Sequence, residues 1–397
     1  MSETAKIVIV GAGYAGLLAA IRTQKQVGAR ARVQLVNQVD LFVERIRQHQ
    51  VAGDQTLARH SIAELLTGTG VELVIGRVSA IETAHSRVIV DGQPLPYDRL
   101  VLALGSRVDR EAVPGIDQHT FTLDERSAAN LALALPSVAR AGGRLLVCGG
   151  GLTGIETASE LAERYPTLAV TLATSGTLGA GLSPKAARHL RRVFARLHIA
   201  VVENVEIAEI RADAAITDGP ALGFELCVWA GGMRAQPLAK DAGLAVNERG
   251  QVIVDACLRS VSHPSIYAVG DQAWVQGAAG SPLHMSCKIA MPMGAHGADN
   301  LSAWVLGKVE QPFDYRDTGI CISLGRKDGI VQTRRTDGTP GNFAITGRLA
   351  AWLKERVCRF TIAMLRAERK HWWRYAWLRS GQVAALPAAS KPKRLAA

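Results

Sequence analysis

Two glycine-rich turns are the clearest candidates for chemistry in this sequence, because their spacing fits the binding of a phosphate group. The stretch IVIVGAGYAGLLAA (residues 7–20) has glycines in the order G-x-G-x-x-G, and LLVCGGGLTGIETA (residues 145–158) repeats that order. The first glycine of such a turn makes a tight bend, the second lets the backbone approach a pyrophosphate, and the third lets helix and strand pack closely. The sequence therefore predicts two dinucleotide-binding sites. Their glycines are Gly11, Gly13 and Gly16 in the first turn and Gly149, Gly151 and Gly154 in the second.

The residue that ends the next strand indicates which nucleotide a turn prefers, since an acid there usually holds a ribose hydroxyl. After the first turn this place holds Asn37, whose amide can accept a hydrogen bond but carries no charge. Asp40 and Glu44 are acids close by that could act in its place. We therefore interpret Asn37 as the ribose contact of the first turn.

The second turn is followed by hydroxyl groups at the same place, Thr174 and Ser175. A carboxylate there would repel the 2′-phosphate of NADPH, whereas hydroxyl groups do not. The sequence therefore admits either NADH or NADPH at the second turn, with Thr174 as a contact. Lys185 and Arg188 are the basic residues that could support a 2′-phosphate.

The elements that must position these turns follow from the alternation of short β-rich runs with helical stretches along the chain. This alternation is typical of an α/β protein with parallel sheets. We expect two Rossmann-like dinucleotide-binding domains followed by a C-terminal amphipathic helical region. Helices are predicted over residues 14–27, 56–67, 125–140, 154–164 and 184–197.

The composition excludes several other classes of protein. The 397 residues are 48% hydrophobic and 20% charged, which is ordinary for a globular chain of two or three domains. The six cysteines are scattered without a C-x-x-C pair, so we expect neither a metal site nor a redox dithiol. No run of 18 apolar residues and no signal-peptide pattern is visible, so we expect a cytoplasmic protein.

Six stretches in a fixed order carry a resemblance to a known family. They are VGAGYAG, YDRLVLALGS (97–106), CGGGLTGIETASELA, CVWAGGMRAQPLA (227–239), VDACLRSVSHPSIYAVGDQA (254–273) and GICISLGRKDGIVQ (319–332). Together they resemble the two-dinucleotide flavoproteins of the pyridine nucleotide–disulphide oxidoreductase superfamily, and most of all type II NADH:quinone oxidoreductases. The resemblance runs from residue 7 to about 332 and so covers most of the chain.

This resemblance implies a cofactor and a role for each turn. The first turn would hold FAD, with Gly105, Gly270 and Asp271 as further contacts, and the second would hold NADH or NADPH as substrate. Hydride would pass from the nicotinamide to the flavin, and two electrons would then pass to an acceptor. Glu156 is carried over as a group near the nicotinamide.

The resemblance also implies a division of the chain. We expect the first part of the FAD-binding domain over residues 1–113, the NAD(P)H-binding domain over 114–247, the second part of the FAD-binding domain over 248–318, and a C-terminal region over 319–397 with a disordered end.

Two stretches depart from the quinone-reducing members of this family. Those members carry an Ala-Gln signature with further glutamines beside the flavin, but residues 283–301 contain no glutamine. Lys288 stands there instead and could favour an anionic reduced flavin or substrate, while Cys287 is best interpreted as a buried, inert thiol. The second departure, FVERIRQHQVAG (42–53), is strongly polar. Its side chains either face solvent or build a polar acceptor pocket in which His49 would carry protons.

The C-terminal tail carries almost all of the net charge. Residues 347–397 contain twelve Lys or Arg and two acids, in a chain whose formal net charge is +11. Within residues 348–380 an apolar stripe at helical spacing is followed by interleaved aromatic and basic residues, which suits a helix on an anionic membrane. The alternative is a helix packed on the protein's own body or on a dimer partner. The stripe is Leu349, Leu353, Val357, Phe360 and Met364.

These observations favour an FAD-dependent NAD(P)H oxidoreductase that passes two electrons to a quinone. The alternatives are a soluble reductase of a small molecule or redox protein, and a flavoprotein sensor with little turnover. The catalytic candidates are Glu156, His49 and Lys288. We expect no nucleic-acid partner, and we leave open a homodimer and a peripheral position on the inner face of the cell membrane.

Overall fold

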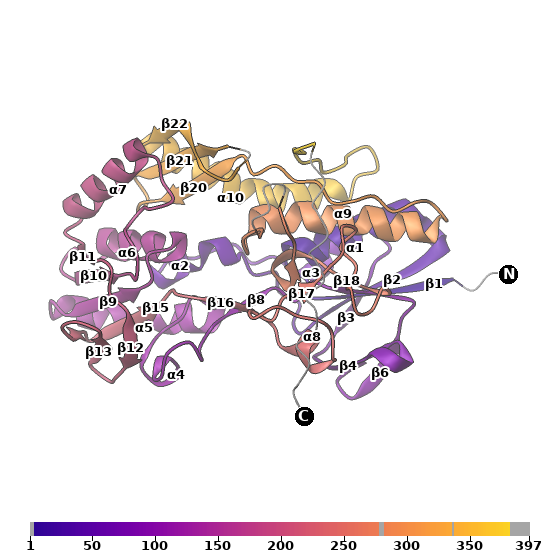
Figure 1. Ribbon diagram of the computed structural model, residues 1–397, viewed down its shortest axis with the longest axis horizontal. Coiled ribbons are helices and arrows are strands. Elements are labelled where there is room, and N and C mark those ends of the chain that lie inside the picture. The colour runs from indigo at the N-terminus through magenta and orange to yellow at the C-terminus, as the bar shows by residue number, and fades with distance from the viewer. Residues whose placement is uncertain (1–3, 278–281, 336, 382–397) are drawn as a thin grey trace, which may run out of the picture.

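Two parallel sheets form the body of the molecule, and the strand before each glycine turn lies inside one of them (Figure 1). The computed structural model describes residues 4–277, 282–335 and 337–381. In the first sheet the central strand is buried on both faces, as its continuous apolar sequence requires. The strand order is β3 (Glu72–Ile75), β2 (Ala31–Asn37), β1 (Ala5–Val10), β7 (Arg99–Leu102) and β18 (Ile266–Ala268).

The second sheet repeats the strand, turn and helix of the first, at the opposite end of the molecule in Figure 1. Its strand β9 ends at the second glycine turn and leads into α6, as β1 leads into α1. Because β18 of the first sheet follows the whole second sheet in sequence, the first sheet is built from two separate parts of the chain. The second sheet runs β11 (Ala200–Val202), β10 (Ala169–Ala173), β9 (Arg144–Cys148) and β15 (Leu226–Trp229).

Helices cover both sheets, and five of them matter for the site. Helix α1 follows the first turn, while α5, α6 and α7 pack on the second sheet within one hydrophobic cluster. Helix α9 lies along α1 in Figure 1. Their bounds are α1 (Tyr14–Val27), α5 (Glu125–Arg140), α6 (Leu152–Arg164), α7 (Pro184–Arg196) and α9 (Cys287–Val305).

Short sheets and helices complete the two lobes. The antiparallel pair of β8 and β16 joins the end of the first lobe to the end of the second. The remaining short strands are β4 (Val78–Glu82), β5 (Arg87–Val90), β6 (Gln93–Pro96), β8 (Ser106–Val108), β12 (Ile207–Ile210), β13 (Ala214–Thr217), β14 (Leu222–Gly223), β16 (Met233–Ala235), β17 (Val252–Ile253) and β19 (Ala273–Trp274). The short helices are α2 (Gln48–Ala52), α3 (Ile62–Leu66), α4 (Ile116–His119) and α8 (Leu238–Asp241).

The C-terminal region lies across both lobes (Figure 1). It consists of an antiparallel sheet, β20 (Gly319–Ser323), β21 (Gly329–Arg334) and β22 (Pro340–Thr346), followed by helix α10 (Arg348–Glu368). The sheet buries Ile320 and Ile322 in the core of the second lobe, whereas α10 buries Ile362 and Leu365 in the core of the first. This region therefore ties the two lobes together.

The structure confirms the predicted fold class and corrects two predicted helices. The helix expected over residues 56–67 is only α3, because Ser61 accepts a hydrogen bond from the N–H of Glu64 and so begins the helix late. The helical tail ends at Glu368, and residues 369–380 run without helix along the body. The division into domains stays a prediction, and its disordered end, residues 384–397, lies outside the described residues.

The apolar stripe predicted for the tail is not the face that α10 buries. Leu349, Val357 and Phe360 are about half exposed. The face that contacts the body is shifted by one residue, because tertiary contacts and not the pattern of apolar residues orient the helix. Its buried residues are Ala350, Cys358, Thr361, Ile362, Leu365 and Glu368.

Candidate active site

The first glycine turn has the backbone of a phosphate-binding loop. Gly11 adopts a φ of 101°, and a Cβ atom there would lie 2.5 Å from the carbonyl oxygen of Ala103. A Cβ atom at Gly16 would overlap the carbonyl oxygen of Gly11, so helix and turn could not approach as they do. Gly13, by contrast, faces open space. The first and third glycines are thus required by packing, whereas the second leaves room for a ligand.

The second turn reproduces this arrangement. Gly149 adopts a φ of 122°, and a Cβ atom there would lie 3.0 Å from the carbonyl carbon of Ala230. A Cβ atom at Gly154 would overlap the carbonyl oxygen of Gly149, while Gly151 again faces open space. Two turns with the same three roles are what two dinucleotide sites require.

The helices that follow the turns begin without a side-chain cap. The N-cap residues are Gly13 for α1 and Gly151 for α6, and neither helix has an acidic residue in its first turn. Their first N–H groups are therefore left for a ligand, and the helix dipole favours a negative one. Helices α3, α5 and α7 have side-chain caps instead, namely Ser61, Asp124 and Ser183.

Of the polar residues predicted near the end of β2, Asn37 contacts the first turn. The side-chain oxygen of Asn37 accepts a hydrogen bond from the N–H of Ala12, 3.0 Å away, and its amide nitrogen donates to the carbonyl oxygen of Val39. The Asn37 amide thus holds the turn, and a ribose contact by it stays a prediction. Asp40 does not reach the turn, since it accepts hydrogen bonds from Ser61 and from the N–H of Ala63.

Asp271 lies on the opposite side of the same turn. One of its carboxylate oxygens accepts a hydrogen bond of 2.6 Å from the hydroxyl of Ser106, the residue after Gly105. The exposed side chain of Arg45 donates to the carbonyl oxygen of Ser106. Gly270 lets this loop approach α1, since a Cβ atom there would lie 3.2 Å from that of Ala15. The structure therefore brings Gly105, Gly270 and Asp271 together at the first turn.

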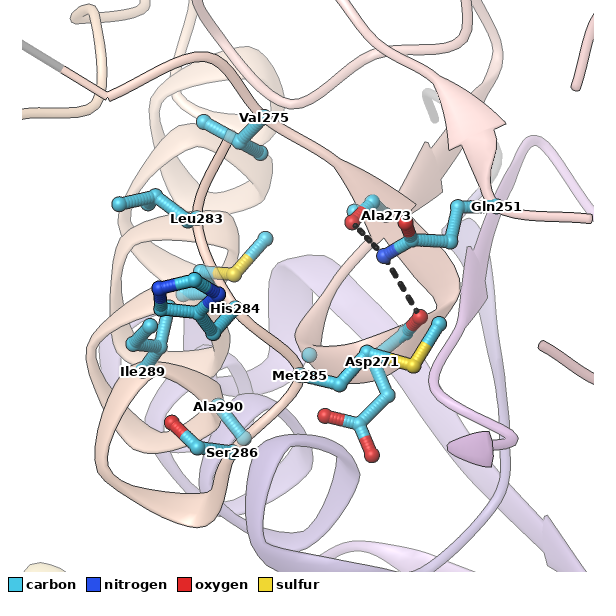
Figure 2. A pocket seen from close by; sticks show the side chains of 12 residues that line it. Gln251, Asp271, Ala273, Val275, Leu283, His284, Met285, Ser286, Ile289 and Ala290 are labelled. Atoms are coloured by element: carbon cyan, nitrogen blue, oxygen red, sulfur yellow. Dashed lines mark hydrogen bonds between the residues drawn. The ribbon is translucent and has the colours of Figure 1, made fainter. Parts of the chain in front are cut away.

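A pocket opens between this loop and the start of α9 (Figure 2). Gln251 fixes its wall by donating hydrogen bonds to the carbonyl oxygens of Asp271 and Ala273. On the other side, α9 begins without a side-chain cap, and the Ser286 hydroxyl is buried with no hydrogen-bond partner among the described residues. An uncapped helix end, an unpartnered hydroxyl and the carboxylate of Asp271, which all line this pocket, suit the polar groups of a flavin nucleotide. These residues fit FAD.

Thr174 stands at the second turn as predicted from its place in the sequence. A Cβ atom at Gly150 would overlap its hydroxyl, so the Thr174 side chain lies against the turn itself. Glu156, on the following helix α6, lies in a buried cluster between the lobes. Contacts of Thr174 and Glu156 with the nicotinamide nucleotide stay predictions.

The buried cluster around Glu156 unites four segments that lie far apart in sequence. One carboxylate oxygen of Glu156 contacts the Lys354 ammonium at 2.9 Å and accepts hydrogen bonds from the N–H of Ser323 at 2.9 Å and from its hydroxyl at 3.1 Å. The other carboxylate oxygen lies 4.0 Å from Nδ1 of His49, whose Nε2 lies 3.3 Å from the Ser323 hydroxyl. Lys354 also donates to the carbonyl oxygen of Cys321.

Charge and burial set the protonation of this cluster. Burial alone would raise the pKa of Glu156, but Lys354 and His49 outweigh it and hold that pKa below its ordinary value. Burial opposes the charge on Lys354 too, yet Glu156 raises the pKa of the ammonium above its ordinary value. Burial, with the nearby cations, lowers the pKa of His49 to about 4. At neutral pH the cluster thus holds an ion pair beside a neutral imidazole.

The polar segment over residues 42–53 turns inward and does not face solvent. Glu44, Arg47 and His49 are all buried, and Arg47 forms ion pairs with Glu44 and with Glu355 of α10. Arg45 is the exception, since it is exposed. The solvent-facing arrangement is therefore wrong for these three side chains, and an acceptor pocket built by them stays a prediction.

Lys288 and Cys287, at the start of α9, are both restrained by their surroundings. The Lys288 ammonium contacts Asp317 at 2.6 Å and donates to the carbonyl oxygen of Gly319, so its charge is balanced. Burial raises the pKa of the Cys287 thiol to about 12, so the thiol stays protonated. Cys148 and Cys227 are adjacent in the second lobe, with their sulfur atoms 3.6 Å apart, a contact that the linear spacing did not suggest.

Lys354 and Ser323 are the cluster members that sequence reasoning missed. A signal for Lys354 exists in hindsight: it lies four residues from both Ala350 and Cys358, on the buried face of α10. In the part of the chain that the structure describes, no group of three or more His, Cys, Asp or Glu residues could hold a metal ion.

Comparisons with known proteins agree with this geometry. The family model of the pyridine nucleotide-disulphide oxidoreductases matches residues 5–294. An NADH dehydrogenase-like protein of Mycobacterium tuberculosis is 29% identical over 320 residues, which is 75% of this chain and 80% of that protein. A type II NADH:quinone oxidoreductase of Staphylococcus epidermidis is 26% identical over 385 residues, 89% of this chain and 94% of that one.

A solved structure shows the same fold. The sulfide:quinone oxidoreductase of the hyperthermophilic bacterium Aquifex aeolicus superposes with a TM-score of 0.81 over 92% of each chain, at 16% sequence identity. Two parallel sheets, each opening on an uncapped glycine turn, define an oxidoreductase that binds two dinucleotides. The chain belongs to the pyridine nucleotide-disulphide oxidoreductase family, and it is an NAD(P)H-dependent enzyme that binds FAD.

Proposed function

We propose that this enzyme passes electrons from NAD(P)H through FAD to a quinone. When bound, FAD accepts hydride from the reduced nicotinamide and supplies two electrons to the acceptor. The first turn, with Asn37, Gly105, Gly270 and Asp271, would hold FAD, and the second, with Thr174, would hold NAD(P)H. The relatives from Staphylococcus and Aquifex carry quinone in their names, which supports this choice of acceptor.

The observation that carries the proposal is the buried cluster of His49, Glu156, Ser323 and Lys354. Reduction of a quinone consumes two protons together with two electrons, so the site needs groups that hold protons away from solvent. Lys354 keeps a proton next to Glu156, and the neutral imidazole of His49 can relay one, taking it up at one ring nitrogen while the other releases one toward the Ser323 hydroxyl or Glu156. We therefore assign proton delivery to this cluster.

The test separates the two halves of the reaction under anaerobic conditions. We expect Glu156→Gln to leave bleaching of the flavin by NAD(P)H within about threefold of wild type, but to slow its re-oxidation by a short-chain quinone about 100-fold or more, as loss of a proton-transfer group does. Glu163→Gln, on the same helix but outside the cluster, is the matched control and should change neither step.

Two results would contradict the proposal. The first is wild-type protein that is bleached rapidly but not re-oxidised by any quinone, which would favour a reductase of another small molecule or of a redox protein. The second is Glu156→Gln that re-oxidises like wild type. Since Glu156→Gln leaves Lys354 buried without its partner, the neutral pair Glu156→Gln with Lys354→Met controls for loss of stability. A flavin that neither nucleotide bleaches would indicate a sensor.

We also propose that the exposed side of α10 docks on an anionic membrane. Trp352 and Phe360 are 56% and 51% exposed on this side, and Phe343 of β22 is 60% exposed. Arg356 lies over the Trp352 ring, which combines a cation with an apolar face. Apolar side chains interleaved with cations fit the boundary between lipid headgroups and acyl chains. None of the described helices is both long and apolar enough to cross a membrane.

A further inference from the structure

The loop after β10, at the second glycine turn, carries a charge arrangement that bears on the choice between NADH and NADPH. This loop begins at the half-buried Thr174. It continues through Ser175, Gly176 and Thr177, and these three residues are exposed. The backbone of Thr174 is held by the end of β11, since its N–H donates to Val202 and its carbonyl oxygen accepts from Val205. The loop is therefore fixed beside the residues that follow β11.

Glu203, directly after β11, is the acid beside this loop, and its charge is already engaged. One of its carboxylate oxygens accepts a hydrogen bond of 2.6 Å from the N–H of Leu178 and another of 2.6 Å from Arg191 of α7. These two donors hold the pKa of Glu203 below its ordinary value, so it stays charged and bonded within the protein. It is thus not free to select NADH by binding ribose hydroxyls with that oxygen.

Arg191 lies next to the same loop with donors to spare. Its Nη2 atom contacts Glu203 and, at 3.4 Å, the carbonyl oxygen of Leu178, while its Nε and Nη1 atoms have no partner among the described residues. The Arg191 side chain is 45% exposed. A guanidinium group with free N–H donors binds phosphate oxygens with good geometry.

The other basic residues of α7 are less suited to this role. Lys185, which the sequence suggested, donates to the carbonyl oxygen of Ala344 and is held on β22. Arg196 pairs with Asp328 in the loop before β21. Arg188 and Arg192 are exposed, and neither has a contact with the loop after β10 in the ranges that the structure describes.

We propose that the second site prefers NADPH over NADH and that Arg191 determines this preference by binding the 2′-phosphate, with the loop hydroxyls of Thr174 and Ser175 beside it. Glu203 acts as a positioning residue that holds Arg191 at the loop. The inference rests on the proposed binding of NAD(P)H at the second turn. It adds the identity of the nucleotide and the residue that selects it.

The test measures nucleotide binding directly, using calorimetry on the FAD-containing protein with adenosine 2′,5′-bisphosphate and with 5′-AMP. We expect wild type to bind the bisphosphate at least about tenfold more tightly. Arg191→Ala should weaken binding of the bisphosphate by about 10- to 100-fold, the range for a charged hydrogen-bond partner, and leave 5′-AMP within about threefold. Arg192→Ala removes the same charge one residue away and should change neither.

Two further variants guard against a loss of folding. Arg191→Lys keeps the charge without the fork of donors and should retain an intermediate preference, whereas Glu203→Ala removes the carboxylate that holds Arg191 at the loop and should weaken binding of the bisphosphate. The ratio of the flavin-reduction rate constants with NADPH and NADH should follow the binding ratio across the series.

The outcomes distinguish this inference from the proposed function. Wild type that binds the two nucleotides equally, or Arg191→Ala that weakens both to the same extent, would overturn the role of Arg191 while the oxidoreductase proposal stands. Protein that binds neither nucleotide would instead remove the second turn as a nucleotide site, and the proposed function with it.

Discussion

At the scale of single residues, the cluster between the lobes shows how burial and pairing divide protonation states among neighbours. Glu156 and Lys354 keep their charges because each offsets the cost of burying the other. His49, only 3% exposed, has no such strong partner and is kept neutral by burial. At neutral pH the cluster therefore holds its extra proton on Lys354, beside the Glu156 carboxylate and a neutral imidazole.

The protonation of His49 predicts a specific dependence of stability on pH. The folded pKa is about 4 and the ordinary value is 6.5, so between these pH values the unfolded chain binds a proton that the folded protein does not. The free energy of unfolding should therefore fall as the pH drops from about 6.5 to 4, by on the order of 3 kcal/mol. Urea unfolding across this range measures it.

His49→Gln should remove this part of the pH dependence, and His119→Gln, at an exposed position, should retain it. Above pH 4.5 the carboxylate of Glu156 does not contribute to this slope, because its pKa is lowered from 4.5 and its contribution is lost only below that pH. If His49→Gln unfolds with the slope of wild type between pH 6.5 and 4, the histidine is not buried in its neutral form.

At the scale of elements, the two strand-turn-helix units perform two tasks with different glycines. Gly16 and Gly154 serve packing, because a side chain at either would overlap the backbone of the first glycine of its own turn. Gly13 and Gly151 leave room for a ligand, because no protein atom lies within 4 Å of a Cβ atom placed at either. Substitutions at these positions should therefore separate stability from cofactor binding.

We expect Gly13→Ala to fold with nearly unchanged stability, since its φ of −77° suits alanine, but to lose about tenfold or more in FAD affinity. Gly16→Ala should instead destabilise the apoprotein by about 1–3 kcal/mol or more, as overpacking does. Thermal unfolding of the apoproteins and titration with FAD give the two quantities. Equal loss of FAD affinity and stability in both variants would contradict this division of roles.

How much of the fold and of the site could be predicted from the sequence depends on whether the contacting residues lie close together along the chain. The turns and their flanking strands were predictable because their signal lies within fourteen consecutive residues, and the fold class followed from their repetition. The cluster was not, because Lys354 approaches Glu156 only through the packing of α10 across both lobes. For the same reason the polar segment over residues 42–53 could not be assigned to the interior without its partner Glu355.

At the scale of the whole molecule, the C-terminal region packs against both lobes with one face and exposes apolar and basic side chains on the other. Glu368 at the end of α10 is fully buried and pairs with Lys25 of α1, and its carboxylate accepts from the N–H of Tyr375. Arg22 pairs with Asp299 of α9 and donates to the carbonyl oxygen of Tyr375. Part of the basic, aromatic tail is thus packed on the protein's own body. This packing was one of the alternatives that the sequence left open for the tail.

The tail also exposes Trp372 and Leu378 beyond α10. The composition of the exposed side of α10 predicts how membrane binding should respond to substitution. We expect wild type to sediment with vesicles that contain phosphatidylglycerol, and to do so less at about 1 M salt, which screens the arginines. Trp352→Ser with Phe360→Ser removes two large apolar side chains while leaving the buried face intact. Burial of such a side chain contributes about 1.5–3 kcal/mol, so vesicle binding should weaken at least about tenfold.

Leu133→Ser, which removes an 81% exposed apolar side chain on α5, should bind like wild type. Sedimentation of the double variant at the wild-type level would show that this face does not meet the lipid.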